Sequence, residues 1–234
     1  MSKLIKVDRV KSVTEAKELE ELGANLISVS LSKDLRFDDD RTIDFETAVS
    51  IKKCLKKSKY VGEFLFEENN YELIQLIKEI GFEYVQFFGY KIPSSNFIGH
   101  LNSQGIEIIC SGITASHDDD PSWILSHFLE QGELSSAYFQ IDLLPEYKNA
   151  WEFLKNESPE YPEELQIEDI DQLAQDNKLL ITLDYSSHNV MDVISYFANI
   201  KGITMILGNS LIEDLHCFDY SEVLVLLRKI KFNE

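Results

Sequence analysis

The sequence predicts a single (β/α)8 barrel, the TIM-barrel class of α/β fold. Eight short apolar runs alternate along the chain with segments of helical periodicity. The apolar runs are nearly continuous, which is typical of parallel strands buried on both faces. A length of 234 residues suits one such barrel. An open, doubly wound α/β sheet is the alternative.

Glycines and capping residues mark the first four strand–helix pairs. The predicted strands are Leu4–Val7, Leu26–Val29, Tyr60–Phe66 and Tyr84–Phe87. The predicted helices are Thr14–Leu22, closed by Gly23; Phe45–Leu55, with Asp44 as N-cap; Asn70–Ile80, ended by Gly81; and Pro93–Gln104, followed by Gly105.

The second half of the chain repeats the alternation with one interruption. The predicted strands are Ile106–Cys110, Tyr138–Ile141, Leu179–Leu183 and Ile203–Leu207. The predicted helices are Pro121–Glu130, capped by Asp120; Asp169–Gln175; Val190–Phe197; and Ser221–Lys231. We therefore expect residues 1–234 to form one domain, with a polar, acidic insertion at about 145–168. Aromatic residues in this insertion are consistent with a lid, a partner surface or packing against the barrel.

The amino-acid composition excludes several classes of protein and of binding partner. Hydrophobic residues make up 44% and aromatic residues 11%, which excludes intrinsic disorder. The formal net charge of −19 argues against nucleic acid and against an anionic membrane surface as partners. No apolar run is long enough to cross a membrane, and residues 1–7 do not resemble a signal peptide. Cys54, Cys110 and Cys217 lack paired spacing, so we expect reduced thiols and a cytoplasmic protein.

Several short motifs, in order along the chain, resemble the phosphoribosylanthranilate isomerase family. Residues 61–64 read V-G-E-F and residues 81–89 read G-F-E-Y-V-Q-F-F-G, where the family has V-G-V-F and G-x-D-x-V-Q-L-H-G. Residues 6–10 are similar to its K-I-C-G-I, residues 35–37 to its S-P-R-Y, residues 140–142 to its L-L-D, and residues 189–190 to its E-N-V. The resemblance implies a barrel that performs an Amadori rearrangement, the isomerisation of an aminoaldose to an aminoketose.

The resemblance implies that Asp8 and Asp142 are the catalytic residues. Asp8 stands where the family has its catalytic cysteine, and both aspartates end predicted strands at the catalytic face of such barrels. The reaction needs one acid and one base, and two carboxylates can divide these roles if their environments separate their pKa values. The alternative is that Asp8 caps a turn and Asp142 accepts hydrogen bonds from backbone amides.

Arg36 and Gln86 are the predicted substrate-binding residues. The resemblance implies that they hold the anthranilate end of a substrate, and a guanidinium pairs well with a carboxylate. A salt bridge from Arg36 to Asp34 or Asp38 is the alternative.

The phosphate site departs most from the family pattern. The glycines that follow strand seven in the family are replaced by Leu183-Asp184, and only Gly208, Asn209 and Ser210 follow strand eight. Ser186 and Ser187 could complete a remnant of the site. A carboxylate such as Asp184 at about 4 Å from a phosphate would repel it by roughly 4 kcal/mol. We therefore expect Asp184 to favour a neutral or cationic ligand.

No cofactor motif and no metal-binding spacing stand out in the sequence, and His117 with the three aspartates after it is interpreted as a solvated loop. Three functions remain open. The first is an isomerase-like enzyme that uses Asp8 and Asp142. The second is an enzyme that acts on an unphosphorylated small molecule in the barrel mouth. The third is a catalytically silent barrel that binds a protein partner or forms a homodimer.

Overall fold

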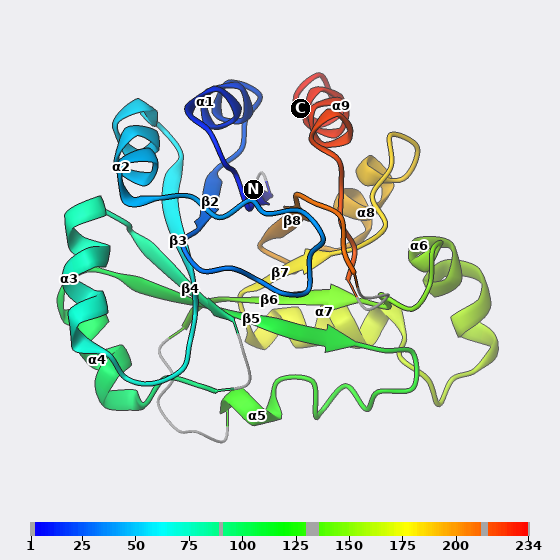
Figure 1. Cartoon of the computed structure of the whole chain (residues 1–234). Coiled ribbons are helices and arrows are strands. Elements are labelled where there is room, and N and C mark those ends of the chain that lie inside the picture. Colours follow the sequence, from blue (N-terminus) through cyan, green and yellow to red (C-terminus); the bar gives the residue numbers. More distant parts are fainter. Residues whose placement is uncertain (1–2, 89–90, 130–135, 212–214, 234) are drawn as a thin grey trace.

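The computed structural model describes residues 3–88, 91–129, 136–211 and 215–233. Eight parallel strands close into a barrel in chain order, with the first strand paired to the last. Figure 1 shows the helices arranged around the outside of these strands. The prediction of a (β/α)8 barrel is confirmed, and the open sheet is wrong because the first and last strands form a continuous ladder.

The strands begin and end within one or two residues of the predicted positions, except that the fifth and sixth are longer. They are β1 (Leu4–Asp8), β2 (Leu26–Ser30), β3 (Lys59–Leu65), β4 (Tyr84–Phe88), β5 (Glu107–Ala115), β6 (Ser136–Leu143), β7 (Leu179–Thr182) and β8 (Gly202–Ile206). The register of β5 against β6 shifts between Cys110 and Ile113, where Gly112 has φ +76°. A bulge of this kind bends a strand and changes the direction of the side chains that follow it.

The helices cover the strands and bury their apolar faces against them. They are α1 (Val13–Glu21), α2 (Phe45–Cys54), α3 (Tyr71–Ile80), α4 (Ser95–Ser103), α5 (Ser126–Leu129), α6 (Ala150–Glu152), α7 (Ile167–Asp176), α8 (Val190–Tyr196) and α9 (Tyr220–Lys231). The Asp44 side chain accepts a hydrogen bond from the Thr47 amide, and Gly81 ends α3 with φ +86°. Both predicted helix boundaries are therefore confirmed.

The helix predicted over 121–130 is wrong in its first half. The Asp120 carboxylate accepts hydrogen bonds from the amide and hydroxyl of Ser122, and backbone turns continue to Ser126. Because Asp120 closes a local turn, it does not cap a helix at Pro121. Glu130, the predicted last residue, lies outside the described residues.

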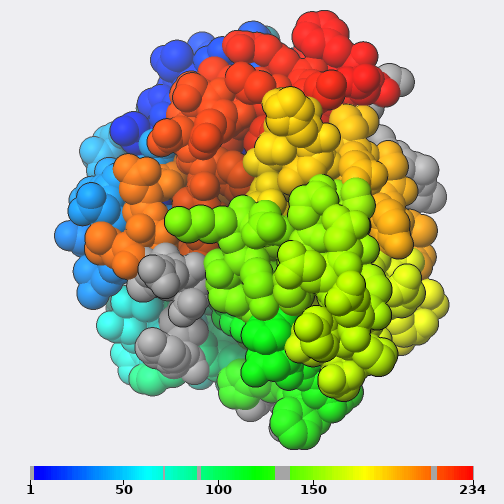
Figure 2. All heavy atoms as spheres, turned by 90° about the vertical axis from the view of Figure 1, so that its right-hand side faces the viewer, coloured from blue at the N-terminus to red at the C-terminus, as the bar shows by residue number. Residues whose placement is uncertain are grey.

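The acidic insertion at 145–168 is helical and packed rather than irregular. After α6, the chain forms a π-helical turn, η1 (Phe153–Glu157), and a 3₁₀ turn, η2 (Ser158–Glu160). Trp151 is fully buried, and its indole Nε1 donates to Asp192 Oδ2 of α8 at 2.9 Å. Figure 2 faces the carboxyl ends of the strands and shows the insertion, in green to yellow-green, spread over one side of this end.

The inside of the barrel changes from apolar to polar along the strands. An apolar layer near the amino ends of the strands consists of Leu4, Leu26, Val61, Tyr84, Ile109, Tyr138 and Leu180. Side chains two residues further along a strand point to the same side. On these strands those side chains are Lys6, Ser28, Glu63, Gln86, Ser111, Gln140 and Thr182, all buried, and we call them the polar ring. The polar ring forms the floor of the barrel mouth.

Candidate active site

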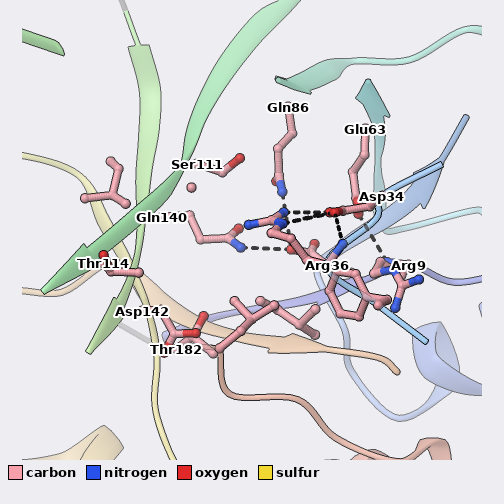
Figure 3. A pocket seen from close by; sticks show the side chains of 16 residues that line it. Arg9, Asp34, Arg36, Glu63, Gln86, Ser111, Thr114, Gln140, Asp142 and Thr182 are labelled. Carbon is pink, nitrogen blue, oxygen red and sulfur yellow. Dashed lines mark hydrogen bonds and ion pairs between the residues drawn. The ribbon is translucent and has the colours of Figure 1, made fainter. Parts of the chain in front are cut away.

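A cavity of about 230 Å³ opens above the polar ring at the carboxyl ends of the strands. Its lining is mostly polar or charged, and Figure 3 shows these side chains converging from several strands. The lining residues are Asp8, Arg9, Asp34, Arg36, Phe37, Glu63, Gln86, Ser111, Gly112, Ile113, Thr114, Gln140, Asp142, Thr182, Ile206 and Leu215. The cavity brings together four of the five predicted catalytic and substrate-binding residues, Asp8, Asp142, Arg36 and Gln86.

Asp8, at the end of β1, is held by a buried network. Its carboxylate is ion-paired with Lys6, which is fully buried and also donates to Gln140 Oε1 at 2.8 Å. The amide nitrogens of Gln140 and Gln86 donate to Asp8 Oδ2 at 2.9 and 3.5 Å. The Gln86 Oε1 atom has no hydrogen-bond partner among the described residues. Both oxygens of Asp8 are therefore fixed, whereas the Gln86 Oε1 acceptor is buried and unsatisfied among the described residues.

Glu63, on β3, is a buried acid beside Asp8. Its Oε1 accepts hydrogen bonds from the Arg9 amide at 3.1 Å and from the Ser28 hydroxyl at 2.5 Å. Burial, and then the negative charge of Asp8, raise the pKa of Glu63 to about 7. A carboxyl group with this pKa can both accept and donate a proton near neutral pH.

Asp142, on β6, forms a dyad with His216. His216 Nδ1 lies 2.6 Å from Asp142 Oδ1, and the His216 amide donates to Oδ2 at 2.9 Å. Burial alone would lower the pKa of His216, but the hydrogen bond and charge of Asp142 outweigh it and raise that pKa. Burial also raises the pKa of Asp142, despite the neighbouring imidazole. The two groups can therefore share a proton at the edge of the cavity.

Arg36 is paired within its own loop. Its Nε and Nη2 donate to the two carboxylate oxygens of Asp34, the latter at 2.6 Å. The pair lines the cavity, and the alternative of a salt bridge with Asp34 is confirmed, whereas binding of a substrate by Arg36 stays a prediction. The resemblance implies that the Arg36 guanidinium binds the carboxylate of a substrate. In this structure the guanidinium is bonded to the carboxylate of Asp34 instead.

Asp184 lies outside the cavity lining. Its Oδ1 accepts a hydrogen bond from the Trp151 amide at 2.9 Å, which ties the end of β7 to the acidic insertion. Ser186 caps the turn before α8, where its hydroxyl accepts from the amides of His188 and Asn189 at 3.3 Å. Ser186 and Ser187 line a separate groove beside α9. The structure therefore separates Ser186 and Ser187 from the cavity, whereas the charge of Asp184, although outside the lining, helps to raise the pKa of His216.

The glycine turn after β8 is already engaged by the chain. The Gly208 amide donates to the Phe218 carbonyl at 3.1 Å, and the Asn209 amide donates to Asp39 Oδ1 at 3.1 Å. Ser210 pairs with Phe37 in an isolated antiparallel bridge. The backbone donors that would bind a phosphate group are thus bonded to other parts of the protein.

The described residues contain neither a metal-binding cluster nor a membrane-spanning helix. Within them, no group of three His, Cys, Asp or Glu side chains lies close enough to hold a metal ion. In the same part of the chain, no helix has the length and apolar character needed to cross a membrane.

The sequence interpretation missed Glu63, Asp34, Gln140, Thr182 and His216 as site residues. The first four could have been found by counting two residues along each predicted strand from an inward apolar position, or by following the loop that holds Arg36. His216 has no such signal, because it comes from the segment after β8 and reaches Asp142 on β6 only through the fold.

The chain matches no protein-family model, and no curated protein matches its sequence. Solved structures match over nearly its whole length. Phosphoribosylanthranilate isomerase from Thermotoga maritima is 16% identical with a TM-score of 0.64, over 99% of this chain and 100% of that one. Phosphoribosylanthranilate isomerase in complex with reduced 1-(o-carboxyphenylamino)-1-deoxyribulose 5-phosphate is 15% identical with the same TM-score and coverage.

A Rubisco-like protein from Rhodopseudomonas palustris matches less well. It is 12% identical with a TM-score of 0.58, over 98% of this chain and 64% of that one. At such identities the likeness concerns the fold and not the reaction. The chain is therefore a (β/α)8 barrel with the fold of phosphoribosylanthranilate isomerase.

Proposed function

We propose that the protein is an enzyme that moves protons on a small, polar, unphosphorylated molecule, by chemistry of the aldose–ketose isomerase type. One observation supports the proposal: the buried acids Asp8, Glu63 and Asp142 line the same cavity in different environments, the first two side by side and the third paired with His216. Asp8 and Glu63 come from β1 and β3, and Asp142 with His216 comes from β6 and the segment after β8. Figure 3 shows Glu63 and Asp142 entering the pocket from different sides.

The two sets suit the two halves of an enolisation. Glu63, with a pKa of about 7, is the group that we propose removes the proton beside the carbonyl carbon. The Asp142–His216 dyad, joined at 2.6 Å, is proposed to protonate and deprotonate the oxygen of the substrate. Asp8, fixed by Lys6 and Gln140, places a negative charge next to Glu63 and keeps it basic. The proposal thus keeps Asp8 and Asp142 from the sequence analysis and adds Glu63 and His216 as their partners.

The cavity favours a neutral ligand rich in hydroxyl or amino groups. Gln86 and Thr182 line it, and their Oε1 and Oγ1 atoms, buried and without hydrogen-bond partners among the described residues, are acceptors that a ligand hydroxyl would satisfy if the side chains turned toward it. The carboxylates of Asp8, Asp34 and Asp142 already have Lys6, Arg36 and His216 as partners, so the charges of the lining are largely balanced, which supports a neutral polar ligand. The mouth is also the size of a small sugar rather than of a drug-sized molecule.

We also propose that the enzyme is cytoplasmic. Cys54 and Cys217 form no disulfide, which supports this location because unpaired thiols persist in a reducing compartment.

Solvent exchange tests the proposal on a panel of candidate substrates. Isomerisation through an enediol exchanges the proton on C2, so unphosphorylated aldoses and aminosugars incubated with the protein in D₂O should lose their C2 proton signal in ¹H NMR. Glu63→Gln and Asp142→Asn should each reduce the exchange rate by at least about a hundredfold. Glu79→Gln, an exposed acid on α3, is the control and should exchange like the wild type.

A second assay separates this proposal from the reaction implied by the resemblance. Freshly prepared phosphoribosylanthranilate should not be turned over, because the glycine turn is occupied. Turnover that is lost in Asp8→Ala and Asp142→Ala would instead establish the isomerase reaction of that family. A folded protein that exchanges no proton with any ligand of this class would contradict the enzyme and favour a binding role.

A further inference from the structure

His216 reaches the mouth from the segment after β8 and has a partner at each ring nitrogen. Nδ1 lies 2.6 Å from Asp142 Oδ1, and Nε2 lies 3.4 Å from the backbone carbonyl oxygen of Tyr147. A carbonyl oxygen can only accept a hydrogen bond, so this contact requires a proton on Nε2. Asp142 Oδ2 accepts from the His216 amide at 2.9 Å, which stabilises the carboxylate form opposite Nδ1. Both ring nitrogens therefore face acceptors.

The charged groups around His216 favour a cationic ring. Asp142 on β6 and Asp184 after β7 place negative charge near the imidazole. The positive charge of Arg36 favours the carboxylate form of Asp142, and Cys217 is a neutral thiol because burial raises its pKa to about 12. The His216 side chain is 11% exposed, so water screens these charges little. The ring is therefore best satisfied with a proton on each nitrogen.

The Tyr147 carbonyl belongs to a tight turn at the start of the acidic insertion. The Tyr147 amide donates to the carbonyl of Leu144 at 3.0 Å, and the Leu144 amide donates to the Ala115 carbonyl at 2.7 Å. Leu144 has φ +50°, a left-handed conformation that is costly for leucine. Such a conformation persists only where the surrounding contacts hold it. The contacts of this turn therefore decide where the Tyr147 carbonyl points.

His117, in the loop after β5, supplies contacts that hold the turn. Glu146 Oε1 accepts from the His117 amide at 2.9 Å and lies 3.1 Å from His117 Nδ1. The His117 ring meets the rings of Tyr147 and Phe153 edge-on, with centroids 5.6 and 6.2 Å away, and those two rings stack at 4.0 Å. The other acids near the Tyr147 ring are Asp118, Glu157 and Glu164. The loop after β5 thus packs on the residue whose carbonyl contacts His216.

We propose that the Tyr147 carbonyl, together with Asp142, holds His216 as the doubly protonated imidazolium. His117 and Glu146 are positioning residues, because they keep this carbonyl in place without lining the cavity. The acidic insertion then contributes a backbone acceptor to the site. The use of the imidazolium as a proton donor in the mouth rests on the proposed function, whereas its protonation state does not.

Long-range ¹H–¹⁵N NMR of the histidine rings tests the proposal, because it distinguishes a protonated ring nitrogen from a bare one. The spectrum of His216→Gln assigns the His216 signals, and both ring nitrogens should carry protons in the wild type at pH 7.0. Glu146→Ala should lower the pH at which His216 loses its first proton by about 0.5–1 pH unit, because the hydrogen bond to the carbonyl is weakened. Glu146→Gln is the matched control. It removes the same charge but keeps an acceptor for the His117 amide, and should shift this titration less than half as far.

A double-mutant cycle tests whether His117 acts through Glu146. His117→Ala should shift the His216 titration in the same direction, and the double variant should shift it no further than Glu146→Ala does. Circular dichroism establishes that each variant is folded, and Glu146→Ser replaces Glu146→Ala if the latter is not.

A bare ring nitrogen on His216 in the wild type at pH 7.0 would overturn the imidazolium. An unmoved titration in folded Glu146→Ala, or an equal shift in Glu146→Gln, would overturn the positioning role. None of these readouts depends on turnover. A cationic His216 in a protein that exchanges no substrate proton would therefore remove the proposed function alone.

Discussion

Glu63 is the acid in the described part of the mouth whose surroundings matter most for the proposed proton transfer. It is 5% exposed and shares its surroundings with Asp8, so that ionisation of both requires two negative charges in a buried space. Lys6 offsets one of these charges through its ion pair with Asp8. Lys6, the Arg9 amide and the Ser28 hydroxyl stabilise the second charge, but burial and the charge of Asp8 outweigh them, so the pKa of Glu63 rises to about 7.

The raised pKa makes the stability of the fold depend on pH. The protonated form of Glu63 is favoured in the folded protein, so its contribution is fully present below a pH of about 4.5 and is lost as pH rises through about 7. Glu63→Gln removes this loss. We expect the free energy of unfolding of Glu63→Gln, relative to that of the wild type, to increase by about 3 kcal/mol between pH 4.5 and pH 8.5.

Urea denaturation at a series of pH values measures this difference. Glu79→Gln on the surface of α3 serves as the control and should show no such trend. A constant difference between Glu63→Gln and the wild type would mean that Glu63 titrates like an ordinary acid and is unsuited to the proposed proton transfer.

The sequence identifies more site residues than its short motifs do, if the alternation of side chains along the strands is also used. Asp8, Arg36, Gln86 and Asp142 were predicted and do line one cavity. Glu63 and Gln140 stand in equally apolar strands, and only the alternation of inward and outward side chains identifies them as part of the mouth. The contact between His216 and Asp142 joins residues 74 positions apart, and no local pattern predicts it.

Residues 36–39 pair with residues 208–211 in a short antiparallel ribbon, the strap. Its conformation depends on one backbone position, Gly208. Gly208 has φ +136°, and a methyl group there would collide with Arg9 and Asp39. We expect Gly208→Ala to lower the free energy of unfolding by about 1–3 kcal/mol more than Gly23→Ala does. Gly23 also has a positive φ, +104°, but nothing lies within 4 Å of its added Cβ, so it controls for backbone strain alone.

Hydrogen exchange distinguishes a local effect on the strap from a global one. The amides of Asp38 and Leu211 should exchange faster in Gly208→Ala, because their bonds join the two halves of the strap. Equal losses of stability in the two glycine variants, with unchanged exchange at these amides, would show that the close approach of Arg9 and Asp39 contributes nothing to the strap.

Trp151 is the largest of several buried side chains that pack the acidic insertion against the barrel. Trp151 is fully buried against Tyr196 and Phe197, whereas Trp123, the other tryptophan of the chain, is 73% exposed. We expect Trp151→Ala to lower the free energy of unfolding by about 3–5 kcal/mol and Trp123→Ala to change it by less than about 0.5 kcal/mol. Circular dichroism in urea measures both. Similar small effects would mean that the insertion packs only loosely.

The sequence predicted helix boundaries best where a capping residue sets them. Asp44 and Gly81 form their caps within a few residues, so the sequence alone locates the ends of α2 and α3. The turns of the insertion were not predicted, because their reason is tertiary: the Trp151 amide and indole bond to Asp184 and Asp192 in a distant part of the chain. A pattern read along the sequence does not contain such contacts.

For the whole molecule, the excess of acidic residues sets the response to salt. The chain has 41 Asp and Glu against 22 Lys and Arg, and its isoelectric point is near 4.6. At neutral pH the net charge of −19 repels itself across the surface, and this repulsion is relieved when the chain unfolds. The ion pairs Lys6–Asp8 and Arg41–Glu15 are buried, so salt screens them far less than it screens the surface.

We therefore expect NaCl to stabilise the protein at neutral pH. Raising its concentration from about 0.02 to 0.5 M shortens the Debye length from roughly 20 to 4 Å, which removes most of the surface repulsion. The Tm measured by scanning calorimetry at pH 7.5 should rise by at least a few degrees. The same titration near pH 4.6 is the control, because the net charge is then close to zero and the rise should largely vanish. A Tm that falls with salt at pH 7.5 would contradict this prediction. It would mean that exposed ion pairs such as Lys59–Glu83 stabilise the protein more than the repulsion between acidic residues destabilises it.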